Sequence, residues 1–310
     1  MVMKKIFSVV FIFLICFSLF SCDNTTTKVT MIVPGGIPLL AVGSLLENKD
    51  LQIEAVSGTE NLTAALSSGS HDIVIAPINL GSTLYLGGKS KYQIAAVITM
   101  NNAYIVTKAS NKLDGIDDLV GKKIVGFGKK GVPGSLLKYL YQTEEKLDYS
   151  ILENNDNWYS SSEEVYGLFK GGTVEYAMMS EPEISKLILN DKVEVNTLNL
   201  CELLDKEIVP QACVFINPNS TKQEEIKNIL ELIENNILYL NENPEGYADK
   251  IIPLHNSFKS MGKEVIVRSI PLTSIVYVEA SSIKEEILDI LLLLDPSNSR
   301  IPDEEFYYQK

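Results

Sequence analysis

The feature that most constrains the fold of this chain is a short pattern that occurs twice, about a hundred residues apart. The first copy, residues 61–77, predicts an amphipathic helix, a glycine turn, an acidic residue and a short apolar strand that ends at a proline. The second copy, residues 168–182, repeats the glycine, the acidic residue, the apolar run and the proline. Because each apolar run is too short for a helix, both fit strands buried in a parallel sheet. We therefore expect two similar α/β halves, although any single βαβ unit has the same pattern.

The residues that follow these strands are candidates for a binding site. Open α/β sheets bind ligands beyond the carboxyl ends of their strands. Pro77 and Asn79 follow the first strand, and Glu181 follows the second. Glu181 also suits a helix start, where the helix dipole favours a carboxylate, so its role can be structural alone.

A loop with paired glycines joins the first predicted strand to its helix. Residues 28–33 predict the strand and residues 39–46 the helix, with Gly35, Gly36 and Ile37 between them. Glycine lets backbone N–H groups approach a bound group closely, and the start of a helix attracts negative charge. The alternative is a plain tight turn.

Two further loops of the first half contribute polar candidates. The strand predicted over residues 51–56 is followed by Thr59 and Asn61, either of which can cap the next helix or contact a ligand. Residues 103–107 predict a strand that leads away from the first sheet, and we interpret it as a crossing between the halves. Asn102 lies immediately before this crossing and is a candidate ligand contact.

The second half repeats the arrangement of strand, glycine loop and helix. Residues 123–127 predict the strand, residues 128–134 a glycine-rich loop, and Ser135 the start of a helix. Gly131, Gly134 and Ser135 can therefore offer N–H and hydroxyl donors to a ligand. A loop without a binding role is the alternative.

Trp158 is the only tryptophan, and it lies in a polar stretch after a strand predicted over residues 149–152. An aromatic side chain in a loop at the end of a strand can stack on a planar ligand. The alternative is that Trp158 covers the core of its half.

The first 22 residues have the organisation of a bacterial secretion signal. Two lysines precede an apolar run, residues 6–20, that is shorter than the ~20 residues of a membrane-spanning helix. The run ends at Leu-Phe-Ser-Cys, which resembles the bacterial lipobox, so we expect Cys22 to carry a diacylglycerol anchor. An ordinary signal peptide that happens to contain Cys22 is the alternative. We expect the mature protein at the extracytoplasmic face of the membrane.

Charge and size narrow the function classes. The formal net charge is −13, and removal of residues 1–21 takes away two lysines and no acids, which leaves about −15. A chain this acidic is an unlikely nucleic-acid ligand, and mutual repulsion favours a soluble monomer. The remaining length suits one large or two medium α/β domains.

Nothing in the sequence predicts a metal, a cofactor or a catalytic centre. His71 and His255 are the only histidines, and neither has a cysteine or carboxylate at ligand spacing. The chain has no nucleophile elbow, phosphate-binding loop or dinucleotide motif. Cys201 and Cys213 lie in apolar segments, where we expect buried free thiols; a disulfide in an oxidising compartment is the alternative.

Taken together, these segments resemble the substrate-binding lipoproteins of ABC importers with the type II periplasmic-binding-protein fold, a group that includes nitrate, sulfonate, taurine and thiamine-precursor binders. The resemblance implies an α/β fold of two lobes, each a mostly parallel sheet flanked by helices, with two hinge crossings. It places residues 28–103 and 217–310 in lobe I and residues 104–216 in lobe II. It is carried by the segments VPGGIP, ALSSGSHDIVIAP, DDLVGKKIVGFGKKGVPGSLLKYL, LFKGGTVEYAMMSEPEISKL and IPDEEFYY.

The resemblance also implies a function: the lobes close on a small molecule and deliver it to an ABC permease, with the loops named above lining the cleft. The anion-binding serines and arginines of some relatives are not matched, because Arg268 and Arg300 are the only arginines. The polar candidates therefore favour a planar polar solute such as a pyrimidine over an oxyanion. An extracytoplasmic sensor remains an alternative, as does an enzyme on the same fold, a dehydratase or pyrimidine synthase, against which the secretion signal argues.

Overall fold

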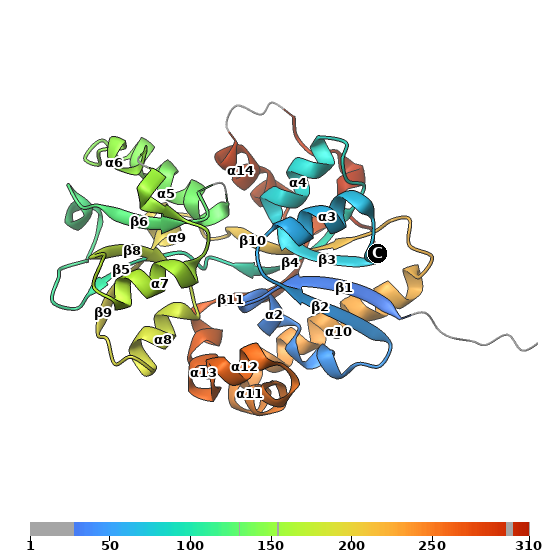
Figure 1. Cartoon of the computed structure of the whole chain (residues 1–310). Helices are drawn as coiled ribbons and strands as arrows, with labels where there is room; N and C mark the ends of the chain where they lie inside the picture. Colours follow the sequence, from blue (N-terminus) through green and yellow to red (C-terminus); the bar gives the residue numbers. More distant parts are fainter. Residues whose placement is uncertain (1–27, 130, 154, 296–299, 310) are drawn as a thin grey trace, which may run out of the picture.

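The computed structural model describes residues 28–129, 131–153, 155–295 and 300–309 (Figure 1). The expected secretion signal and Cys22 lie outside this part of the chain. The described residues form two α/β lobes that lie side by side, as expected from the repeated pattern. Among their helices, none combines the length and the apolar character needed to cross a bilayer.

Lobe I is built on a six-stranded sheet with the order β11-β4-β10-β3-β1-β2. Its central strands β1 and β3 pair in parallel, whereas β10 runs antiparallel to both of its neighbours, β3 and β4. The strands are β1 (Val29–Pro34), β2 (Leu51–Val56), β3 (Ile73–Pro77), β4 (Gln93–Met100), β10 (Pro210–Ile216) and β11 (Ser274–Glu279).

Helices cover both faces of this sheet (Figure 1). On β3, Ile73 and Ile75 pack with α2 and α10, whereas Val74 and Ala76 pack with α3 and α4 on the opposite face. Burial on both faces explains why β3 is a continuous apolar run. The helices of lobe I are α2 (Ile37–Ala41), α3 (Glu60–Ser68), α4 (Ile78–Leu86), α10 (Gln223–Glu242), α11 (Pro244–Ile251), α12 (Asn256–Met261), α13 (Lys263–Leu272) and α14 (Lys284–Leu294).

Lobe II has a five-stranded sheet with the order β7-β6-β8-β5-β9. Here β6 pairs in parallel with β7 and β8, and β5 runs antiparallel to β8 and β9. The strands are β5 (Tyr104–Lys108), β6 (Ile124–Phe127), β7 (Trp158–Tyr159), β8 (Tyr176–Met179) and β9 (Val195–Asn199). The helices are α5 (Val132–Thr143), α6 (Ser150–Glu153), α7 (Ser162–Lys170), α8 (Glu183–Leu189) and α9 (Leu200–Leu203).

The repeated pattern occupies matching positions in the two lobes. α3 leads through Gly69 into β3, and α7 leads through Gly172 into β8. Both glycines have positive φ values, 70° and 73°, which an L side chain rarely adopts. Each pattern is therefore a helix, a left-handed turn and a buried strand, as predicted.

Three local expectations are wrong. The sheets are mixed rather than mostly parallel, because β5 and β10, the strands that follow the crossings, run antiparallel to β8 and β3. Residues 210–216, which we expected in lobe II, form β10 in the lobe I sheet. Residues 150–153 form the helical turn α6 instead of a strand.

The lobes are joined by more than the two chain crossings. Asn101, in the first crossing, accepts a hydrogen bond from the backbone of Val209 and donates one to the carbonyl of Glu207, so the two crossings are tied together. α14 packs against α5 of lobe II, and one apolar core continues between the lobes through these helices. The C-terminal tail packs back on lobe I, where the backbone N–H of Tyr308 bonds to the carbonyl of Ile94 at 2.9 Å.

Candidate ligand-binding cleft

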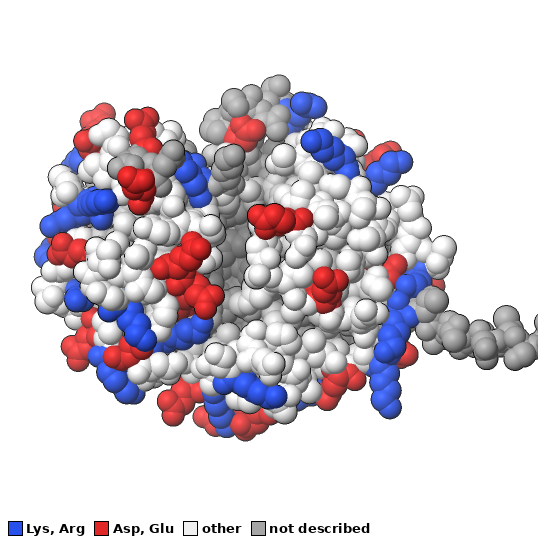
Figure 2. Space-filling model, viewed as in Figure 1, with Lys and Arg blue, Asp and Glu red and all other residues white. Residues whose placement is uncertain are grey.

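A cleft of about 1540 Å³ lies between the lobes and is lined by residues of both. Figure 2 shows it as the hollow that separates the two halves of the molecule. Its walls are the carboxyl ends of β1, β3, β6 and β8 and the first turns of the helices that follow them. This is the edge at which open α/β sheets bind ligands.

Most of the residues predicted from the sequence meet in this cleft. They come from loops that lie far apart in the chain and belong to both lobes. Those that line the cleft are Gly35, Gly36, Ile37, Thr59, Pro77, Asn79, Asn102, Gly131 and Glu181.

Asn61, Gly134 and Ser135 do not line the cleft. Asn61 is an exposed residue in the first turn of α3. α5 begins at Val132, so Gly134 and Ser135 are helical rather than part of the loop. A Cβ on Gly134 would lie only 2.3 Å from the carbonyl oxygen of Gly128, and the glycine thus allows the loop to pack on its own helix.

Trp158 also lies outside the cleft lining, because its indole packs within lobe II. The indole Nε1 donates a hydrogen bond to the carbonyl of Leu152 at 2.8 Å. The ring packs so closely on Gly126 that a Cβ there would lie 2.9 Å from it. The ammonium groups of Lys129 and Lys138 lie 6.0 and 5.6 Å from the ring centre. The structure favours the core interpretation of Trp158 over ligand stacking.

Asn102 ties the first crossing to both lobes at the base of the cleft. Its side chain accepts a hydrogen bond from the backbone N–H of Glu181 at 2.8 Å and donates one to the Glu181 carbonyl at 3.1 Å. Its backbone N–H donates to the side-chain oxygen of Gln211, on β10, at 3.3 Å. The amide nitrogen Nε2 of Gln211 is buried and has no hydrogen-bond partner among the described residues.

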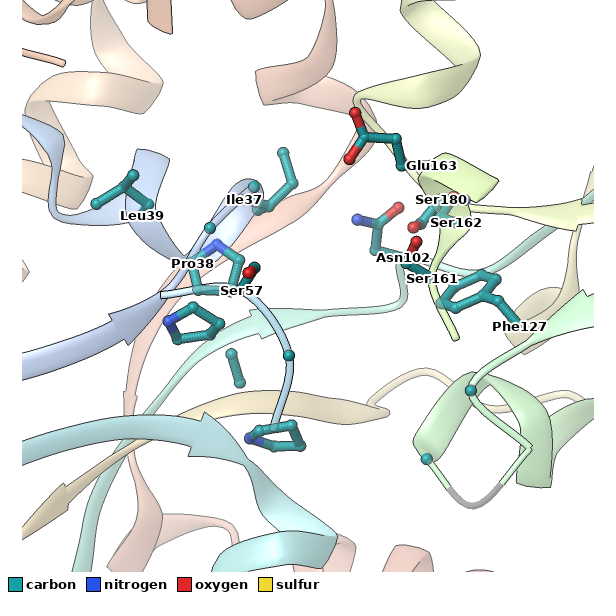
Figure 3. A pocket seen from close by; sticks show the side chains of 18 of the residues that line it. Ile37, Pro38, Leu39, Ser57, Asn102, Phe127, Ser161, Ser162, Glu163 and Ser180 are labelled. Atoms are coloured by element: carbon teal, nitrogen blue, oxygen red, sulfur yellow. Dashed lines mark hydrogen bonds between the residues drawn. The ribbon is translucent and has the colours of Figure 1, made fainter. Parts of the chain in front are cut away.

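Apolar side chains face one another across the cleft. Ile37 and Pro38 form part of the lobe I wall, and Phe127 and Tyr159, which are neighbours in the β6–β7 pairing, form part of the lobe II wall. Figure 3 shows Phe127 opposite Ile37 and Pro38. The cleft can thus hold an apolar or planar group between its two lobes.

The comparisons with known proteins agree with this geometry. Residues 46–247, about two thirds of the chain, match the family described as NMT1/THI5 like. The chain belongs to the NMT1/THI5-like family. No curated protein matches the chain.

Solved structures that are similar to this NMT1/THI5-like chain include proteins described as components of ABC transporters. An ABC transporter protein from Parabacteroides distasonis has a TM-score of 0.73 and 19% identity, over 92% of this chain and 99% of that one. The periplasmic aliphatic sulphonate binding protein SsuA from Escherichia coli has a TM-score of 0.66 and 15% identity, over 91% and 92%. The ligand-binding component of an ABC-type import system from Staphylococcus aureus has a TM-score of 0.61 and 14% identity, over 91% and 96%. The expected two-lobed binding-protein fold is confirmed.

The NMT1/THI5-like cleft also contains serines that we did not predict as site residues. They lie at the start of α7 or just before it, and only the tertiary fold brings this helix start beside the cleft. Ser161 caps α7 and accepts a hydrogen bond from the backbone of Glu164, and Ser162 accepts one from the backbone of Ser180 at 3.0 Å. Ser160, Ser161 and Ser162 all line the cleft on its lobe II side. Figure 3 shows Ser161 and Ser162 there.

A second missed group comes from α12, near the C-terminus. His255 caps this helix through its ring nitrogen Nδ1, which accepts a hydrogen bond from the backbone of Ser257 at 3.1 Å. Ser257, Ser260 and Met261 follow it in the lining. Because this segment lies far along the chain from the first strand, only the tertiary fold brings it to the cleft.

Two buried glutamates stand out electrostatically. Burial raises the pKa of Glu181, although hydrogen bonds from Ser185 and the charge of Arg268 lower it in part. Burial also raises the pKa of Glu183, against the effect of Lys186, whose ammonium group lies 3.3 Å away. Within the described part of the chain, no group of three or more His, Cys, Asp or Glu side chains can hold a metal ion.

Proposed function

We propose that this protein is the extracytoplasmic substrate-binding component of an ABC importer, which closes its lobes on a small organic solute and presents it to a permease. The observation that carries the proposal is the cleft itself, which residues of two separate lobes line. The family match and the fold of the solved binding proteins support it.

Closure requires that the solute contact both lobes, because a ligand shifts a conformational equilibrium only through its different affinity for the two states. The cleft offers such contacts from each side. Gly35, Gly36 and Thr59 belong to lobe I, whereas Gly131 and Glu181 belong to lobe II. We assign the predicted residues that line the cleft to ligand binding on this basis.

We further propose that the solute has a planar polar part. The aromatic rings of Phe127 and Tyr159 suit stacking, and the side chains of Thr59, Asn79 and Asn102 can bond to its polar edge. A pyrimidine-like compound has both properties.

The remaining proposals concern the oligomeric state of the mature protein and its attachment to the membrane. We propose that the mature protein is a monomer anchored through a diacylglycerol on Cys22, at the outer face of the cell membrane, because residues 1–22 have the pattern of a lipoprotein signal. We assign it no catalytic role.

The test is a thermal unfolding screen of the chain from residue 23 onward against pyrimidines, thiamine precursors, sulfonates, nitrate, amino acids, simple amines and nucleosides. A ligand at a hundred times its Kd adds about 2.7 kcal/mol of stability, which raises Tm by several degrees. A hit that is recovered chemically unchanged supports transport. A hit that is converted supports an enzyme instead, and a screen without any hit contradicts the proposal.

A further inference from the structure

Asn101, in the first crossing, is fastened to the second crossing by both ends of its side chain. The side-chain oxygen accepts a hydrogen bond from the backbone N–H of Val209 at 2.9 Å, and the amide nitrogen donates one to the carbonyl of Glu207 at 2.7 Å. Val209 immediately precedes β10 of the lobe I sheet. These bonds therefore attach Asn101 to the lobe I end of the second crossing.

The next residue, Asn102, is attached to lobe II instead. Its side chain accepts from the backbone N–H of Glu181 at 2.8 Å and donates to the Glu181 carbonyl at 3.1 Å. Two longer bonds, both 3.3 Å, join the lobes at this point: the backbone N–H of Asn102 donates to Gln211 of lobe I, and the carbonyl of Asn101 accepts from the side chain of Asn199, at the end of β9. The boundary between the two lobes in the first crossing thus falls at the peptide link between Asn101 and Asn102.

The backbone of Asn101 has a conformation that few side chains adopt. Its φ is 55°, in the left-handed region, which a Cβ makes unfavourable and which asparagine tolerates better than most residues. Such a conformation persists only where the surrounding structure holds it. The side-chain bonds to Val209 and Glu207 supply that restraint.

Two helix contacts between the lobes lie on opposite sides of this link. α14 packs against α5 at one end of the interface, and α13 packs against α8 at the other (Figure 1). Beside the second contact, the hydroxyl of Tyr104, the first residue of β5, donates to the carbonyl of Leu272, the last residue of α13, at 2.6 Å. A rotation about the line through these two contacts and the Asn101–Asn102 link moves the cleft walls while all three junctions stay in place.

The described arrangement of the lobes leaves room for such a rotation. The cleft has a volume of about 1540 Å³. Small-molecule sites usually have about 300–1,000 Å³, so a solute that touches both walls requires them to approach each other. The described arrangement is therefore the open one.

We propose that closure pivots at the peptide link between Asn101 and Asn102, and that Asn101 is a positioning residue that limits how far the lobes swing when no solute is bound. This inference rests on the proposed function, since it says where the closure occurs. Asn101 is not among the described residues that line the cleft, so it acts through the lobe arrangement and not by contact with the solute.

The test measures distances between two nitroxide labels by double electron–electron resonance, in the chain from residue 23 onward without solute. One label pair, Asn61→Cys on α3 and Gly167→Cys on α7, lies on opposite sides of the cleft; both positions are exposed. A second pair, Gln142→Cys on α5 and Asp289→Cys on α14, lies across the rotation axis, also at exposed positions. Cys201 and Cys213 are buried and stay unlabelled.

Asn101→Gly keeps the left-handed backbone, removes both side-chain bonds and adds conformational freedom. It should widen the distance distribution of the cleft pair by at least about 1.5-fold and leave that of the axis pair unchanged. Lys192→Gly is the matched control, because Lys192 has the same backbone conformation, with φ 57°, in an exposed loop of lobe II away from the crossings. This control should leave both distributions unchanged.

An unchanged distribution of the cleft pair in the Asn101→Gly variant would overturn the inference. Equal widening in the Lys192→Gly variant, or equal widening of both label pairs, would overturn it too, because the change would then be general loosening. Should Asn101→Gly fail to fold, Asn101→Asp takes its place: it keeps the acceptor for Val209, loses the donor to Glu207, and must also widen the cleft pair alone. No solute is used, so a negative result leaves the binding function to the solute screen, whereas a screen without hits removes that function whatever the distances are.

Discussion

The carboxylate of Asp72 accepts a hydrogen bond from the ammonium group of Lys222, with 2.8 Å between the two atoms. The same carboxylate accepts from the backbone N–H of Thr30 at 2.8 Å and from the hydroxyl of Ser220 at 2.6 Å. The acidic residue of the first repeat therefore fastens β3 to β1 and to the segment that leads into α10. In the second repeat, Glu175 bonds to Asn111 beyond β5. The repeated acids are structural.

Replacement of Lys222 by Met should destabilise lobe I by about 2 kcal/mol, because it leaves the Asp72 carboxylate buried without its cation. Urea unfolding measures the change. Lys146→Met is the matched control, since the Lys146–Asp117 pair is exposed and should contribute less than about 1 kcal/mol. Equal losses of unfolding free energy in the two variants would contradict a stabilising role of the Asp72 network beyond that of an exposed ion pair.

The same network predicts an acid-side pH dependence. Burial acts to raise the pKa of Asp72, but hydrogen bonds from Lys222, Ser220 and Thr30 outweigh it and hold the pKa below 3.8. A lowered pKa contributes stability that is present above pH 3.8 and is lost as the pH falls through the folded-state pKa. The unfolding free energy of Asp72→Asn should therefore fall less steeply than that of the wild type on acidification in this range. Parallel curves would contradict this assignment.

Trp158→Ala should destabilise the protein by about 3 kcal/mol without changing the affinity for a solute, because the indole packs on Gly126 and bonds to Leu152 outside the cleft. Phe127→Ala, in the lining, should instead weaken a planar solute by about tenfold. Denaturant unfolding and calorimetric titration separate the two effects. A large loss of affinity in the Trp158 variant would contradict this assignment and indicate that Trp158 contacts the solute.

Gly134→Ala should destabilise lobe II, since a Cβ would lie 2.3 Å from the carbonyl oxygen of Gly128 and 2.9 Å from the backbone of Lys129. Gly167→Ala is the control: it is also helical, and a Cβ there meets nothing within 4 Å. The control should raise stability by about 0.5–1 kcal/mol. Thermal unfolding of both variants tests the contrast, and a stable Gly134 variant would refute the close packing of loop and helix.

Glu181→Gln should stabilise the unliganded protein at neutral pH, because it removes a buried charge and keeps an acceptor for the Ser185 N–H. Folding raises the pKa of Glu181 above its unfolded-state value of 4.5. The stability that protonated Glu181 contributes is therefore fully present below pH 4.5 and is lost as the pH rises through the folded-state pKa. The gain of the Gln variant should thus disappear toward pH 4. A gain that stays constant over pH would contradict the buried-charge explanation.

The sequence predicted those parts of the fold that depend on local patterns. The strands at Ile73–Pro77 and Tyr176–Met179 were found because each is a short apolar run after a glycine turn. β4, an equally buried strand at Gln93–Met100, was not predicted. The place of β10 in the lobe I sheet was missed because strand pairing joins residues far apart in the chain.

The candidate site residues also divide into those that local patterns indicate and those that only the tertiary fold brings together. Residues in loops at the ends of predicted strands, such as Gly35 and Pro77, line the cleft, and their contact with a ligand stays a prediction. Trp158 stayed open between ligand stacking and core packing, because the sequence alone cannot tell a loop aromatic that faces a ligand from one that packs on a glycine of a neighbouring strand. The α12 segment at His255 could not be predicted, since no local signal shows which distant helix reaches the cleft.

A bound solute should draw the two lobes together. Small-angle X-ray scattering of the chain from residue 23 onward, with and without a saturating hit from the solute screen, measures this closure. We expect a smaller radius of gyration and a shorter maximum dimension at unchanged mass. An unchanged scattering profile at full saturation would contradict closure and the function built on it.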